Sequence, residues 1–234
     1  MSDSFPALAT TVTGHGPALL LAHGATGSIA DNFAPVLSAL AVAHTVVAPD
    51  YPGSGATEPA PAPLDLDALT DAVVTSAVSR GVERFAVLGF SLGTAVAVRA
   101  AVRHPERVTA LVLTAGLARA DDHLLGLLPG WRASEPARLR PHIDLIPTLD
   151  TTADLPRVTV PTLVIATTRD SMVRPANSRL LAAGIPGASY AELPTDHVAM
   201  VEDPRGWLKP VLSFLAARDT AADSGRLRDL TRPH

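Results

Sequence analysis

Short apolar runs alternate along the chain with longer segments whose apolar residues recur at helical spacing. Several of the runs contain almost no polar residue, as expected for strands that are covered on both faces of a sheet. The runs predict strands over residues 18–22, 45–48, 85–89, 110–114, 162–166 and 189–193. The segments between them predict helices over residues 32–41, 66–79, 92–104, 176–183 and 203–217. This alternation predicts an α/β fold, with a mostly parallel central sheet and helices on both of its faces.

Two segments depart from the alternation. Residues 117–160 carry scattered Pro, Asp and Arg around a cluster of leucines, which predicts a short helical lid inserted between two strands. Residues 219–234 are polar and have no apolar period, which predicts a flexible C-terminal tail. The rest of the chain has the length of one domain, so we expect a single α/β domain over residues 1–218 that includes the lid.

Composition narrows the possible functions. Hydrophobic residues make up 47% of the 234 residues and charged residues 18%, which is typical of a packed globular protein. The net charge of −4 includes no long run of one sign, so nucleic-acid binding is not expected. No stretch resembles a signal peptide or a membrane span, which predicts a cytoplasmic protein that does not contact a membrane. The absence of cysteine excludes disulfides, thiolate metal sites and a cysteine nucleophile.

The pentapeptide GFSLG, residues 89–93, joins a predicted strand directly to a predicted helix. A G-x-S-x-G sequence arises by chance in roughly one chain of this length in twenty, and a plain turn is the alternative interpretation. The strand-to-helix setting favours a nucleophile elbow, in which a strained turn lifts the serine above the edge of the sheet. Ser91 is therefore the predicted nucleophile.

A second glycine-rich segment, HGATG at residues 23–27, follows the first predicted strand. Such a loop can present backbone N–H groups, and those of Ala25 and Leu92 would form an oxyanion hole with two donors. For His23 we favour a structural role beneath the site over proton transfer. Asp50 opens the turn DYPGSG after the next strand, and we expect it to hold loop backbone.

The serine needs a general base, and eight histidines are available. They are His15, His23, His44, His104, His123, His142, His197 and His234. His197 is the predicted base, because it follows the last predicted strand at the edge where α/β sheets bind ligands. His123 and His142 lie in the lid, which is a less rigid platform for a base. The predicted acid is Asp170, which also follows a strand, whereas Asp196 is adjacent to His197 and their side chains should diverge.

Taken together, these motifs resemble those of the α/β-hydrolase superfamily. HGxxG, DxPGxG and GFSLG each follow a strand, and a strand-xxxD segment and an xDH segment come after them, across residues 17–217. The pattern is similar to the small esterase, lactonase and haloperoxidase-like members. The resemblance implies no metal and no organic cofactor. It implies a nucleophile, an acid, a base and two oxyanion donors at Ser91, Asp170, His197, Ala25 and Leu92.

The sequence departs from the family pattern in three places. Thr167 stands three residues before the acid and Asp196 immediately before the histidine, where the family usually has glycine. Neither change removes a catalytic group. The third departure is the lid, which is short beside the helical caps of the family and predicts a shallow pocket. The predicted pocket walls are Leu124, Leu125, Leu127, Leu128 and Trp131, with ordinary packing of this cluster onto the sheet as an equal alternative.

The predicted function is a serine hydrolase that cleaves an ester, thioester or lactone through an acyl-enzyme. An apolar lid and few charges favour a small to medium uncharged substrate. One alternative keeps the Ser-His-Asp site and uses it as a lyase, cyclase or acyl transferase on a biosynthetic intermediate. Another is a ligand-binding member with a vestigial triad. A small-molecule substrate is the expected partner, and the sequence leaves the oligomeric state open.

Overall fold

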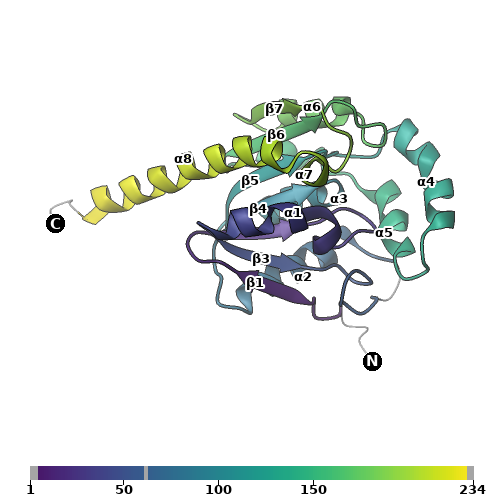
Figure 1. Ribbon diagram of the computed structural model, residues 1–234, viewed down its shortest axis with the longest axis horizontal. Helices are drawn as coiled ribbons and strands as arrows, with labels where there is room; N and C mark the ends of the chain where they lie inside the picture. Colours follow the sequence, from purple (N-terminus) through teal and green to yellow (C-terminus); the bar gives the residue numbers. More distant parts are fainter. Residues whose placement is uncertain (1–4, 61–62, 231–234) are drawn as a thin grey trace.

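The structure is a computed structural model that describes residues 5–60 and 63–230, with backbone alone over 219–230. Seven strands form one sheet in the order β1-β3-β2-β4-β5-β6-β7 (Figure 1). They are β1 Thr10–Thr13, β2 Ala18–Ala22, β3 Thr45–Pro49, β4 Phe85–Phe90, β5 Val108–Thr114, β6 Thr162–Thr167 and β7 Ser189–Leu193. All neighbouring strands are parallel except β1, which is antiparallel to β3. The predicted α/β class and mostly parallel sheet are confirmed.

Helices cover both faces of the sheet. The helices are α1 Ile29–Ala41, α2 Leu66–Val78, α3 Leu92–Arg103, α4 Asp122–Ser134, α5 Arg140–Leu145, α6 Pro175–Gly184, α7 Ala199–Glu202 and α8 Pro204–Leu230. Because side chains alternate along a strand, neighbours on β2 enter different layers. Leu20 belongs to the hydrophobic cluster that contains Val96 of α3. Leu21 belongs to the opposite cluster, with Phe33 of α1 and Trp207 of α8.

The edge strand β1 is the one strand of this sheet that the apolar runs do not predict. Its sequence is TTVT, and three of its four residues are exposed. An edge strand with a solvated surface needs no apolar run, so a search for such runs misses it. The six predicted strands all form, with ends that differ by a residue or two.

The lid, residues 117–160, lies between β5 and β6. It contains α4, α5 and two 3₁₀ turns, η1 Ile146–Thr148 and η2 Leu155–Arg157. In Figure 1 its helices lie at one end of the molecule, beyond the carboxyl ends of the strands. This position sets the lid over the edge where the predicted site residues lie.

The backbone is helical through Leu230. The sequence predicts a flexible tail from residue 219 and does not predict this helical extension. Figure 1 shows α8 projecting from the body of the molecule. A missing apolar period predicts that a segment does not pack, but it does not exclude a helix. Half of the residues at 219–230 are Ala, Arg or Leu, which favour a helix, and the other half are Asp, Thr, Ser or Gly. Residues 231–234 lie outside the described part of the chain. Over the described residues, no helix combines the length and apolar character that crossing a bilayer requires.

Candidate active site

Ser91 lies at a sharp turn between β4 and α3. Its backbone has φ 52° and ψ −119°, and a positive φ is strained for a residue with a side chain. The flanking glycines allow the turn. A Cβ on Gly89 would lie 2.8 Å from the carbonyl carbon of Gly93, and a Cβ on Gly93 would lie 2.5 Å from that of Ala22. The chain therefore has the geometry of a nucleophile elbow at this position.

The side chains of Ser91, Asp170 and His197 meet at the carboxyl edge of the sheet. Ser91 Oγ is 3.0 Å from His197 Nε2, and His197 Nδ1 is 2.6 Å from Asp170 Oδ2. Because the carboxylate can only accept, Nδ1 carries the proton and Nε2 accepts from the serine hydroxyl. The Asp170 side chain is completely buried, and the His197 side chain is 15% exposed. The three predicted residues thus form one hydrogen-bonded chain that ends at the serine.

The carboxylate of Asp170 is held by the acid loop, residues 168–173, and by the end of β6. Its Oδ1 accepts from the backbone N–H groups of Met172 and Val173, both at 2.9 Å. Its Oδ2 accepts from the hydroxyl of Thr167 at 3.0 Å. Thr167, noted in the sequence only as a departure from glycine, therefore supports the same oxygen that contacts His197. Together with the contact to His197, these make four hydrogen bonds to one carboxylate, which fix its position.

Asp196, the rival acid, does not contact the imidazole. Its Oδ1 accepts from the backbone N–H of His197 at 2.8 Å. Its own N–H donates to Glu202 Oε2 at 2.7 Å, and Glu202 also pairs with Arg169 of the acid loop. Asp196 therefore holds the backbone of the histidine turn. This agrees with the prediction that neighbouring side chains diverge.

The oxyanion loop, residues 23–27, is tied to its surroundings on both sides of Ala25. The Gly24 N–H donates to Asn32 Oδ1 at 2.9 Å, and the Gly27 carbonyl accepts from the Ser54 hydroxyl at 2.6 Å. Neither Ala25 nor Leu92 has a hydrogen-bond partner for its N–H in residues 5–60 and 63–230. Leu92 opens α3, whose first amides have no partner within the helix. Both predicted donors are thus free to bind a substrate oxygen.

His23 and Asp50 have the structural contacts expected of them. The His23 ring is fully buried, with Nδ1 2.7 Å from the Gly24 carbonyl and Nε2 accepting from the Tyr51 N–H at 2.8 Å. Burial lowers the pKa of His23 to about 3, so the ring is neutral and Nδ1 donates. Asp50 Oδ1 accepts from the Ile29 N–H at 2.8 Å. Both side chains hold backbone, His23 in the two loops beneath the site and Asp50 at the first residue of α1.

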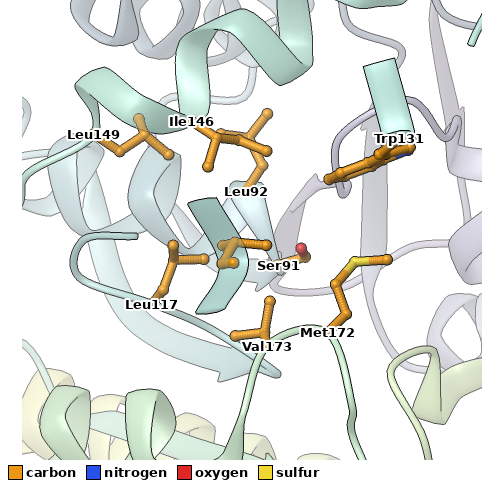
Figure 2. Close-up of a pocket in the computed structure, with 9 residues that line it drawn as sticks. Ser91, Leu92, Leu117, Trp131, Ile146, Leu149, Met172 and Val173 are labelled. Atoms are coloured by element: carbon orange, nitrogen blue, oxygen red, sulfur yellow. The ribbon is translucent and has the colours of Figure 1, made fainter. Parts of the chain in front are cut away.

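A narrow cavity of about 10 Å³ adjoins the serine (Figure 2). Ser91 and Leu92 line it from the elbow, and Met172 and Val173 line it from the acid loop. The lid contributes Leu117, Leu124, Trp131, Ile146 and Leu149. Apart from the serine hydroxyl, the side chains around this cavity are apolar.

Only some of the lid residues predicted to form the pocket wall line the cavity beside Ser91. Leu124 and Trp131 line the cavity, but Leu128 is buried in the core, and Leu125 and Leu127 are 37% and 39% exposed. Leu125 and Leu127 lie on other sides of α4 than Leu124, because residues adjacent on a helix point in different directions. Leu128 is one turn after Leu124 and is buried in the same core cluster, but it does not line this cavity. The lining also includes Met172 and Val173, which the sequence analysis does not predict. They follow Asp170 by two and three residues, and this position places them at the same edge of the sheet.

The sequence matches the α/β-hydrolase fold family over residues 17–142, which is more than half of the chain. The chain therefore belongs to the α/β-hydrolase family. Pyrrolizixenacetamide deacetylase from Xenorhabdus hominickii is 28% identical, over 89% of this chain and 94% of the relative. A hydrolase from Pseudomonas aeruginosa PA01 has a TM-score of 0.78 and 26% identity, over 89% of this chain and 94% of its own.

The fold is also shared with the enol-lactonase from Burkholderia xenovorans LB400. That structure has a TM-score of 0.79 at 24% identity, over 89% of this chain and 96% of its own. The Xenorhabdus and Pseudomonas relatives are named as a deacetylase and a hydrolase, in agreement with an enzyme of this family.

Proposed function

We propose that the protein is a serine hydrolase that cleaves an uncharged carboxylic ester, thioester or lactone through an acyl-enzyme. The observation that carries the proposal is the hydrogen-bonded chain from Ser91 Oγ through His197 to the buried Asp170 carboxylate. A serine hydroxyl is a weak nucleophile until a positioned base accepts its proton, and the base needs an orienting group. The free N–H groups of Ala25 and Leu92 can donate hydrogen bonds to the oxyanion that develops in the transition state, and so stabilise its negative charge.

The proposed reaction has two steps. His197 Nε2 takes the proton of Ser91 as Oγ bonds to the carbonyl carbon, and the oxyanion forms against Ala25 and Leu92. Each of these donors contributes about 3 kcal/mol to lowering the barrier. His197 then protonates the leaving oxygen or sulfur, which departs and leaves the acyl group on Ser91. Water, deprotonated by His197, attacks the carbonyl carbon of the acyl-enzyme. The bond to Ser91 Oγ then breaks, His197 returns the proton to Oγ, and the acid is released.

A fluorophosphonate probe tests the nucleophile. We expect one label per chain, on the peptide that contains Ser91, because only an activated serine reacts rapidly with the probe. Mass spectrometry measures the number of labels per chain and identifies the labelled peptide. A chain that stays unlabelled under conditions that label a known serine esterase would point to a binding protein with an inactive triad.

Turnover in water enriched with oxygen-18 separates hydrolysis from the other chemistries that the same triad supports. Hydrolysis through an acyl-enzyme places one labelled oxygen in the carboxylic acid product. A lyase, cyclase or transferase reaction leaves the product unlabelled, and that outcome contradicts the proposal.

The cavity beside Ser91 favours a short acyl group. Its volume, about 10 Å³, is that of about one water molecule, so a methyl group fits and a longer chain must displace the lining side chains. The apolar lining suits a hydrocarbon and offers nothing to a charged acyl chain. The name of the Xenorhabdus relative, a deacetylase, agrees with an acetyl group at this position.

For nitrophenyl esters we expect kcat/KM to be highest with acetate and to fall by about tenfold or more at hexanoate. In Figure 2 the Met172 side chain lies beside Ser91, so Met172→Ala should widen the cavity and raise the hexanoate-to-acetate ratio. Leu180→Ala, on an exposed side chain of α6, is the matched control. A wild-type enzyme that prefers hexanoate, or a ratio that Met172→Ala leaves unchanged, would contradict the acyl-pocket assignment.

A further inference from the structure

His142 is a lid residue whose side chain, among residues 5–60 and 63–230, makes hydrogen bonds only outside the lid. It lies in α5 and is completely buried. Nδ1 lies 3.1 Å from the backbone nitrogen of Thr26, and Nε2 lies 2.8 Å from the carbonyl oxygen of Pro52. One imidazole thus joins the lid to the oxyanion loop and to the turn after β3.

The two partners determine the protonation state of this ring. The Thr26 N–H can only donate, so Nδ1 must offer its lone pair. The Pro52 carbonyl can only accept, so Nε2 must carry the hydrogen. Burial lowers the pKa of His142, against smaller opposing effects of the Pro52 hydrogen bond and of Glu135. The neutral form with Nε2–H satisfies both contacts, and a protonated ring would face the Thr26 N–H with a second N–H.

His142 and His23 hold two successive peptide units of the oxyanion loop. The unit that carries the Ala25 N–H also contains the Gly24 carbonyl, which accepts from His23. The next unit carries the Thr26 N–H, which donates to His142. Both rings then connect to the same turn, His23 through the Tyr51 N–H and His142 through the Pro52 carbonyl.

Thr26 needs such an anchor. Its φ is 58°, in the left-handed region, which is a rare conformation for a β-branched residue. Strained backbone of this kind persists only where surrounding contacts fix it. If the Thr26 peptide relaxed, the adjacent Ala25 N–H would rotate with it, and an oxyanion donor misplaced by about 1 Å lowers the rate by roughly 100-fold.

We propose that His142 is a positioning residue, through which the lid sets the direction of the Ala25 N–H in the oxyanion hole. The proposal rests on the proposed function, because it assigns a task in that reaction. It also gives the lid a role besides covering the substrate, since α5 becomes part of the scaffold of the hole.

Three substitutions separate the two hydrogen bonds. In His142→Asn the amide oxygen can replace Nδ1 as the acceptor for Thr26. In His142→Gln the amide nitrogen can replace Nε2 as the donor to Pro52, but the Thr26 acceptor is lost. His142→Phe keeps the size of the ring and removes both contacts. His104→Gln, at the end of α3 and outside the site, is the control.

We expect His142→Gln and His142→Phe to lower kcat for an activated acetate ester by about 10-fold to 100-fold. KM should change little, and His142→Asn should recover most of kcat. Deuterium uptake of the peptide spanning residues 23–28 should rise in the Gln and Phe variants and stay near the wild-type level in the Asn variant. If His142 contributed to stability alone, the loss of kcat would instead parallel the loss in melting temperature across the variants. His142→Asn would then not recover kcat.

The two proposals fail in different ways. If the wild-type chain turns over the ester and His142→Phe keeps its kcat and the same uptake at residues 23–28, the positioning role is overturned and the hydrolase remains. If the wild-type chain neither reacts with the fluorophosphonate nor turns over the ester, the proposed function is overturned and the positioning role with it.

Discussion

Replacing Ser91 with alanine should lower kcat for an activated acetate ester by a factor of at least about 10⁴ and leave the fold intact. The hydroxyl is the atom that bonds to the carbonyl carbon, and no other residue of the site offers a nucleophile in its place. Among the residues that the structure describes, its one side-chain hydrogen bond is to His197 Nε2. Removing the hydroxyl therefore removes the nucleophile and changes the packing very little. Steady-state kinetics measure the loss of kcat, and the melting temperature shows whether the fold is unchanged.

Ser178→Ala is the matched control for this substitution. Ser178 is also buried, on α6, and its Oγ has no hydrogen-bond partner within the described chain. Its activity should equal that of the wild type. A Ser91→Ala enzyme that retains most of the wild-type kcat, in preparations free of contaminating esterase, would refute the assignment of the nucleophile.

Substituting Gly93 with alanine should destabilise the protein by more than about 4 kcal/mol, which is enough to prevent folding of many domains. The new Cβ would lie 2.5 Å from the carbonyl carbon of Ala22, closer still to the carbonyl oxygen, and 2.8 Å from the His23 oxygen. All three are backbone atoms of β2 and the oxyanion loop. Backbone atoms cannot avoid the new Cβ by a change of rotamer, so strand β2 itself would have to shift.

Gly126→Ala is the same chemical change at an open site. Gly126 lies inside α4, and a Cβ there would meet nothing within 4 Å. Because alanine favours a helix over glycine, this variant should be more stable by about 0.5–1 kcal/mol. Denaturant titration measures both variants. Equal stability of Gly93→Ala and the wild type would show that the elbow is not packed as described.

The sheet and the meeting point of Ser91, Asp170 and His197 could be predicted from the sequence for one physical reason. Parallel strands buried on both faces must be apolar throughout, which makes them visible, and their carboxyl ends share one edge. A polar residue directly after such a strand is therefore placed in three dimensions by its position alone. This logic located Asp170 and His197, which are 27 positions apart in the chain.

The lid could not be predicted in the same way. Its helices are short, and the side that each presents to the site depends on tertiary packing. Leu124 faces the cavity while Leu125, its neighbour, is exposed. Its place in the lid predicts a less rigid position for His142, yet the side chain is buried and hydrogen-bonded to two loops. The sequence shows Thr167 only as a departure from glycine, because its hydrogen bond to Asp170 depends on the turn after β6.

The dispersed anchoring of residues 23–27 limits how this enzyme can be re-engineered. The pentapeptide HGATG is bonded to side chains of Asn32, Ser54 and His142, which belong to three other parts of the chain. Transplanting the five residues into another hydrolase would leave those partners behind. A chimera in which the lid is exchanged would likewise lose the Thr26 acceptor unless a histidine were supplied at the equivalent place.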